Sequence, residues 1–329
     1  MNCKSTIESA QRDQLIRRIL ADLLQQSNEL RYSMLGNRII TTLLHWKQLP
    51  KNPPPLQVAG VFNVTLFVGL LLGQQLGYGD NRIITALSIA MIAFITFIWV
   101  ELRKPQPLLQ LSLFKNPLFS VSILCGFLVF AANFCFNIIA PFYAQNMLNL
   151  SPFYAGFLLM LLPISMVVVA PISGALSDKI CSELLTFAGL VVMVTAQFGL
   201  AQLHAGSSVL LVGLWIAMLG IGSGLFQSPN NSLIMSKVPR TQLGSAGSVN
   251  SLVRNVGMVV GITIATTILF NVMSSKAGNR VTGLIPDRPE LFLAGMHVVF
   301  VTSATICLVA AILTGWRLLS AVRTQKVEA

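Results

Sequence analysis

Polar side chains inside long apolar runs are the residues of this sequence that could do chemistry. Arg254 stands out, because no other charged side chain falls well inside an apolar run. A charge near the centre of a bilayer costs about 2.5–3.5 kcal/mol on insertion scales, so Arg254 is expected to face a cavity or a partner. The alternative is a guanidinium that reaches along its apolar stem to the membrane surface.

Small and polar residues share the face of the helix on which Arg254 is expected. Asn250 precedes Arg254 by one turn, and Gly247 lies on nearly the same side. Gly257 and Gly261 have the GxxxG spacing, which lets a second helix approach closely in a membrane. This face is therefore predicted to contact protein rather than lipid.

Two amides form a second polar stripe upstream. Asn133 and Asn137 are four residues apart, so they share a helical face with Phe130. An amide surrounded by hydrocarbon must find a hydrogen-bond partner. The stripe predicts either a cavity wall suited to amphiphilic or cationic organic molecules, or hydrogen bonds between helices.

A third group of polar and small residues ends another apolar run. Gln227 and Asn231 lie on one side of it, close to Pro229, which bends a helix because it lacks a backbone donor. Gly220 and Gly224 repeat the GxxxG spacing. These features suit a bent gating helix, and they equally suit ordinary close packing.

The elements that must position these residues are membrane-spanning helices. Of the 329 residues, 54% are hydrophobic and only 10% are charged, against about 25% charged in soluble domains. Runs of 18 or more apolar residues predict transmembrane helices. We therefore predict an all-α integral membrane protein with eight spans, at residues 56–76, 83–100, 118–140, 153–176, 184–203, 209–226, 246–270 and 291–316.

The spans divide the chain into segments. Residues 1–51 are polar and basic, and they form either an amphipathic surface helix or an unordered extension. Residues 52–102 are predicted to be a two-helix hairpin, residues 103–117 a cytoplasmic linker, residues 118–318 a six-helix domain, and residues 319–329 a cytoplasmic tail.

The basic residues predict the orientation of the spans. With the N-terminus in the cytoplasm, 17 Lys and Arg residues lie in cytoplasmic segments and 4 lie outside. This bias favours eight spans with both termini in the cytoplasm. The net charge of +11 is thereby explained by membrane orientation, and no nucleic-acid partner is expected.

No pattern in the sequence indicates catalysis, a metal or a cofactor. The five cysteines form no C-x-x-C pair, and the three histidines are isolated. We found no Ser-His-Asp constellation and no phosphate-binding loop. An enzyme is therefore not expected, and neither a cofactor nor a metal is expected.

Three sequence stretches carry a family resemblance. They are ELRKPQPLLQLSLF at residues 101–114, GIGSGLFQSPNN at 220–231 and SAGSVNSLVRNVG at 245–257. Together they resemble the fourteen-helix drug:proton antiporter branch of the major facilitator superfamily, from about residue 56 onward. The resemblance implies two linker helices followed by the C-terminal six-helix domain of a multidrug efflux protein.

A loop after the fourth predicted span resembles the superfamily's cytoplasmic loop signature. Gly174, Asp178 and Lys179 match the signature. Cys181 stands where the signature usually has Gly, and Glu183 where it usually has a basic residue. The acidic Glu183 therefore reverses a local charge of the signature.

The resemblance also implies a missing part. The family carries a six-helix N-terminal domain, and residues 1–51 offer no counterpart. The expected protein is therefore a multi-pass transporter of the bacterial inner membrane, incomplete alone, that uses a separate N-terminal half or self-association to move a small organic substrate. The alternative is a non-transporting remnant or membrane scaffold. Since no Asp or Glu lies inside a predicted span, the chain alone is not expected to couple transport to protons.

Overall fold

The computed structural model describes the chain from residue 116 to residue 328, apart from residues 178, 237, 280 and 282–287. For residues 241 and 319–328 it describes the backbone alone. Upstream it describes residues 113 and 114 and the helical positions 88, 91–93, 95, 96 and 99. The predicted N-terminal segment, the span at residues 56–76 and nearly all of the linker lie outside the described residues.

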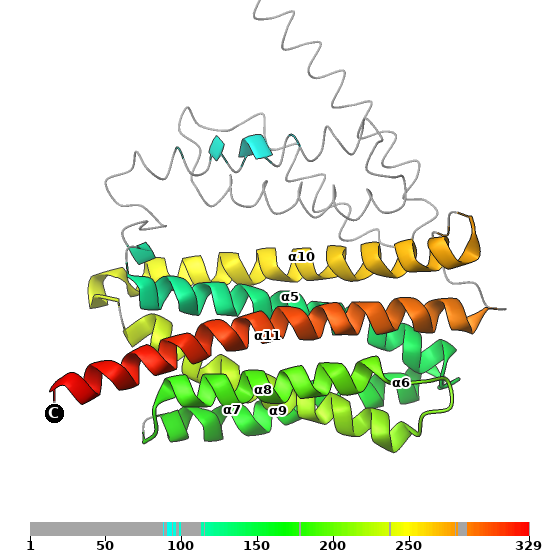
Figure 1. The fold of residues 1–329 in the computed structure, drawn as a ribbon, viewed down its shortest axis with the longest axis horizontal. Helices are drawn as coiled ribbons and strands as arrows, with labels where there is room; N and C mark the ends of the chain where they lie inside the picture. Colours follow the sequence, from blue (N-terminus) through cyan, green and yellow to red (C-terminus); the bar gives the residue numbers. More distant parts are fainter. Residues whose placement is uncertain are drawn as a thin grey trace, which may run out of the picture.

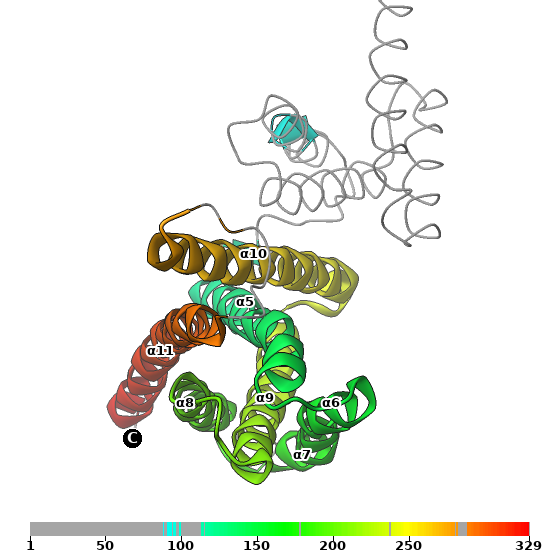
Figure 2. The same cartoon turned by 90° about the vertical axis from the view of Figure 1, so that its right-hand side faces the viewer.

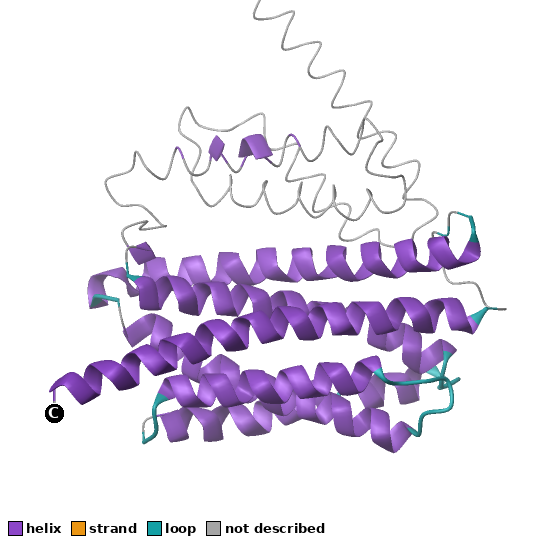
Figure 3. Cartoon of the chain, in the orientation of Figure 1, coloured by secondary structure: helices purple, strands orange, loops and turns teal. Residues whose placement is uncertain are grey.

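Six helices in the described chain are long and apolar enough to cross a membrane, with α6 and α7 taken together as one. Helices and short connections account for the whole described part, which contains no strand (Figure 3). The helices are α5 (Pro117–Asn146), α6 (Pro152–Leu159), α7 (Leu161–Ser177), α8 (Ser182–Ala201), α9 (Val209–Ser236), α10 (Leu243–Ala277) and α11 (Pro289–Glu328), with a short 3-10 turn at Arg240–Gln242. For the described residues the prediction of an all-α membrane protein is thus confirmed, whereas the count of eight spans stays a prediction.

Most helices extend beyond the predicted spans. The prediction ended at residues 140, 226, 270 and 316, but the corresponding helices end at residues 146, 236, 277 and 328. Hydropathy measures only the apolar depth of the bilayer, whereas a helix continues until a capping residue ends it. Gly278 ends α10 in this way, with a left-handed φ of 74°.

The predicted span 153–176 is interrupted near its middle. Helix α6 ends at Leu159 and α7 begins at Leu161, with Met160 between them. Pro163 has no N–H, so the carbonyl of Leu159 loses its usual donor four residues on. The interruption is therefore a local consequence of one proline.

Four helices form a ring at the centre of the bundle. Helix α5 packs against α11, α11 against α8, α8 against α9, and α9 against α5. Helix α10 packs on the outside of α5, and α7 packs on the outside of α9 (Figures 1 and 2). The residues singled out by the sequence are carried mainly by α5, α9 and α10.

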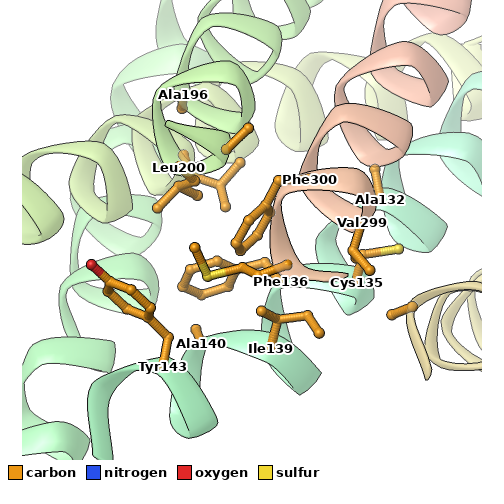
Figure 4. Packing of buried hydrophobic residues seen from close by; sticks show 14 of the residues in the cluster. Ala132, Cys135, Phe136, Ile139, Ala140, Tyr143, Ala196, Leu200, Val299 and Phe300 are labelled. Carbon is orange, nitrogen blue, oxygen red and sulfur yellow. The ribbon is translucent and has the colours of Figure 1, made fainter. Parts of the chain in front are cut away.

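An apolar core fills the inside of this ring. Phe136 of α5 and Phe300 of α11 lie with ring centroids 6.4 Å apart, next to Leu200 of α8 (Figure 4). Cys135 and Ala132 of α5 are fully buried beside them. This core fixes the rotation of α5, so Asn133 and Asn137 must lie toward its other sides.

Glycines allow two of the helix pairs to touch closely. A Cβ placed on Gly257 of α10 would lie 2.8 Å from the carbonyl oxygen of Phe127, and one on Gly261 would overlap the backbone of Ala131. On α9, a Cβ on Gly224 would lie 3.1 Å from the carbonyl oxygen of Met166, and one on Gly220 would overlap the backbone of α7. Both GxxxG pairs therefore lie against a neighbouring helix.

Helices α6–α7 and α10 are the least covered spans. Only 11% of the apolar window of α6–α7 is buried, and 28% of that of α10, compared with 61% for α5. Large apolar side chains such as Phe153, Phe157 and Val167 are about two-thirds exposed or more. These two parts of the bundle therefore present apolar surface to lipid or to another protein.

Candidate functional site

Arg254 and Phe130 lie together between α10 and α5. The guanidinium carbon of Arg254 lies 4.6 Å from the centroid of the Phe130 ring, within the range of a cation–π interaction. Both side chains are partly buried. The guanidinium of Arg254 therefore lies against the aromatic face of Phe130, where α10 packs on α5.

The two amides of α5 differ in their surroundings. Asn133 is partly buried, and its Nδ2 donates to Oγ of Ser223 on α9 at 3.3 Å. Asn137 is exposed, and its Nδ2 donates to the carbonyl oxygen of Asn133 at 3.0 Å. Asn133 therefore joins two helices, while Asn137 keeps its Oδ1 available on the surface.

A third contact joins α9 to α10. Nδ2 of Asn250 donates to Oδ1 of Asn231 at 3.0 Å, and both side chains are partly buried. Gln227, one turn before Asn231, is also partly buried. The seven predicted cavity residues thus gather on α5, α9 and α10, although no single contact unites them.

Two residues of the predicted loop signature lie within the described chain. A Cβ on Gly174 would lie 3.0 Å from Oγ of Ser228, so α7 and α9 approach closely there. Lys179 is exposed, and its N–H donates to the carbonyl oxygen of Leu176 in a tight turn. Asp178 lies outside the described residues, so its predicted polar contacts stay a prediction.

A buried cation was missed by the sequence reasoning. Arg317 was counted among the cytoplasmic bases, but only 3% of its surface is exposed in the bundle. Its guanidinium donates to Oγ of Ser122 at 2.6 Å and to Oγ1 of Thr186 at 3.3 Å, which joins α11 to α5 and α8. Because Arg317 directly follows an apolar run, no periodicity in the sequence distinguishes it from a surface base.

Asn230 was missed beside Asn231. It is 3% exposed, and its Nδ2 donates to the carbonyl oxygen of Ser122 at 3.3 Å. Its Oδ1 and the Nε of Arg317 are buried without a hydrogen-bond partner in the described structure. Ser122 therefore binds two buried polar side chains, one through its hydroxyl and one through its carbonyl.

A pocket of about 240 Å³ opens beside Asn137. Its walls come from α5 and from the α6–α7 junction. The lining residues are Phe136, Asn137, Pro141, Gly156, Leu159, Met160, Leu162 and Pro163. Among the described residues, no cluster of His, Cys, Asp or Glu could hold a metal ion.

A bundle of six membrane-capable helices with polar contacts between α5, α9 and α10 has the character of a membrane transport protein. The sequence profile of the Major Facilitator Superfamily matches residues 58–262. The chain belongs to this superfamily.

Individual relatives are transporters of bacteria and not enzymes. The riboflavin transporter RibZ of Clostridioides difficile is 31% identical over 68% of this chain and 50% of its own length. The uncharacterized transporter YebQ of Escherichia coli is 28% identical over 85% of this chain and 59% of its own length. The multidrug transporter protein MdtP of Bacillus subtilis is 29% identical over 71% of this chain and 44% of its own length. The chain thus spans about half the length of these relatives.

Proposed function

We propose that this chain forms one wall of the substrate path in a transporter of the drug:proton antiporter branch, which exports small organic compounds. The observation that carries the proposal is the polar face shared by α5, α9 and α10, where Phe130, Arg254 and Asn133 make their contacts. An aromatic ring, an amide and a cation suit amphiphilic organic molecules. The relatives named for riboflavin and multidrug transport support this substrate class.

The second wall is proposed to come from another six-helix body, either a separate N-terminal half or a second copy of this chain. The two least covered spans, α6–α7 and α10, are available for it, since they flank α9 and α5 on the outside of the ring. Substrate sites of such transporters lie near the midplane, where two repeats meet. The length of the relatives supports this arrangement.

Proton coupling is proposed to depend on the second body. Within the described spans, the carboxylates are Glu183 and Glu290, which lie in the first turns of α8 and α11. A proton carrier in a transporter needs a carboxylate at depth, where neighbouring groups shift its affinity for protons. A separate N-terminal half would supply that group, whereas the described spans of a second copy of this chain would add no carboxylate at that depth.

An efflux assay in bacteria that lack their own pumps tests the proposal. The chain is expressed alone and together with the N-terminal six-helix half of RibZ or MdtP, and export of riboflavin and of a cationic dye is followed by fluorescence. We expect export by at least one pair, and export by the chain alone only where it self-associates. The matched control is the same pair carrying Asn133→Leu, which should be inserted equally well and transport less.

The outcomes separate the parts of the proposal. Export by the chain alone as a monomer would overturn its dependence on a second body. If no pair exports any compound although both halves reach the membrane, the transport function is overturned and a scaffold is favoured.

A further inference from the structure

The pocket beside Asn137 has the size of a small ring system. Its volume is about 240 Å³. An apolar cavity of about 150 Å³ is enough to hold benzene. The pocket therefore has room for one ring or for two fused rings.

The walls of the pocket are largely apolar and carry no charge. Six lining side chains are apolar, among them Phe136 and Met160, and no ionisable residue lines the pocket. Asn137 supplies the one polar side chain of the lining. An ion would lose its hydration there without meeting a counter-charge, so an uncharged ligand is favoured.

Two prolines leave backbone carbonyls of pocket-lining residues without their usual helical donors. Pro141 lies four residues after Asn137, and Pro163 lies four residues after Leu159, and all four residues line the pocket. Because proline has no N–H, the carbonyls of Asn137 and Leu159 lose their usual helical donors. A backbone carbonyl in apolar surroundings is stabilised by finding another donor.

The side chain of Asn137 adds a third acceptor. One of the two N–H groups on its Nδ2 donates to the carbonyl oxygen of Asn133 at 3.0 Å. Its Oδ1 makes no hydrogen bond within the described structure, and the residue is exposed. Oδ1 of Asn137 and the two carbonyls outnumber the second N–H of the Asn137 amide, so a ligand that donates a hydrogen bond is favoured.

We infer that this pocket binds an uncharged, flat one- or two-ring group that carries an N–H or O–H donor. The ring fills the space between Phe136 and the α6–α7 junction, and the donor meets the acceptors around Asn137. The assignment rests on the proposed transport function, for which it defines one part of the substrate.

Two fluorinated indoles probe the pocket directly. Purified full chain in nanodiscs is titrated with 5-fluoroindole, which has an N–H, and with its 1-methyl analogue, which has none, and binding is followed by fluorine NMR. We expect saturable binding of 5-fluoroindole. The N-methyl analogue should bind about twofold to tenfold more weakly, as befits the loss of one neutral hydrogen bond.

Variants of the pocket locate the binding. No heavy atom lies within 4 Å of a Cβ placed on Gly156, so Gly156→Leu fills the pocket without a steric clash and should abolish saturable binding. Gly244→Leu on α10 is the matched control, because its Cβ is equally free and Gly244 does not line the pocket. Pro163→Ala returns a donor to the Leu159 carbonyl and should reduce the preference for the N–H probe.

Three results would overturn the inference. They are partitioning of the probes without saturation, equal binding by Gly156→Leu and the native chain, and equal affinity for the two indoles. Because binding is measured without transport, a failure of the efflux assay leaves this result interpretable, and the two proposals can fail separately.

Discussion

Within the described part of the chain, the Arg254 cation lies against an aromatic ring and against no carboxylate. At a distance of 4.6 Å from the Phe130 ring, the interaction contributes about 0.5–2 kcal/mol, depending on how far the pair is desolvated. The sequence left two interpretations of Arg254 open: a functional cation, or a cation that reaches the membrane surface. The contact with Phe130 is part of both.

The first prediction concerns this pair. Arg254→Met and Phe130→Leu should each lower the free energy of unfolding, measured by SDS titration in mixed micelles, and the double variant should show a coupling of about 0.5–2 kcal/mol. Arg254→Lys is the control, because it keeps the cation and should retain most of the stability. Strictly additive effects would argue against the interaction.

Arg317, unlike Arg254, is buried, and two hydroxyl groups accept hydrogen bonds from its guanidinium. Ser122 and Thr186 also donate to carbonyl oxygens of their own helices, at 2.8 Å each. These hydroxyls therefore remain bonded if the arginine is replaced. The guanidinium, by contrast, is left with an unmet donor if a hydroxyl is removed.

The second prediction follows from this asymmetry. Ser122→Ala should cost about 1–3 kcal/mol of unfolding free energy, because it leaves a charged donor buried without its acceptor. Arg317→Met should cost less, since an apolar side chain of similar length replaces the buried charge. In the same SDS titration, the double variant should resemble Arg317→Met. A larger loss for Arg317→Met than for Ser122→Ala would contradict this account.

At the scale of elements, the contact between α5 and α10 depends on glycine. Helix α10 approaches so closely that the position of a Cβ on Gly261 is occupied by backbone atoms of Ala131, which cannot rotate away. Between membrane helices, small residues permit the van der Waals contact that holds them together.

The third prediction tests this packing. Gly261→Val should separate α10 from α5 and lower the free energy of unfolding by about 1–3 kcal/mol, as expected for overpacking. Gly244→Val, on the same helix with nothing within 4 Å, should change it by less than about 1 kcal/mol. SDS titration measures both, and equal effects would show that close packing is not the cause.

At the scale of the whole molecule, the orientation in the membrane determines which face meets the cytoplasm. The connection between α7 and α8 carries Cys181, which is exposed, while Cys125, Cys135 and Cys307 are buried in the bundle. The positive-inside bias predicts that this connection lies in the cytoplasm.

The fourth prediction uses that thiol. In a Cys3→Ser background, a membrane-impermeant maleimide should label Cys181 in inverted bacterial membrane vesicles and leave it unlabelled in right-side-out vesicles. Cys181→Ser is the control that identifies the labelled site. Labelling in right-side-out vesicles alone would reverse the proposed orientation.

The sequence by itself determined the class of the molecule. Apolar runs of membrane length require helices, because a backbone in hydrocarbon must satisfy its own hydrogen bonds. The six spans in the described chain follow from this rule. The motifs at residues 220–231 and 245–257 resembled the superfamily to which the chain belongs. The GxxxG spacing placed Gly257 and Gly261 on a contact face.

Only the tertiary structure decided which polar groups meet. The pairing of Arg254 with Phe130, the burial of Arg317 and the acceptors around Asn137 depend on how each helix is rotated and how far it is shifted along its neighbours. Hydropathy is nearly uniform around these helices, so the sequence says little about rotation. The packing of side chains such as Phe136 and Phe300 sets the rotation of each helix about its axis. These contacts exist only once the helices are assembled.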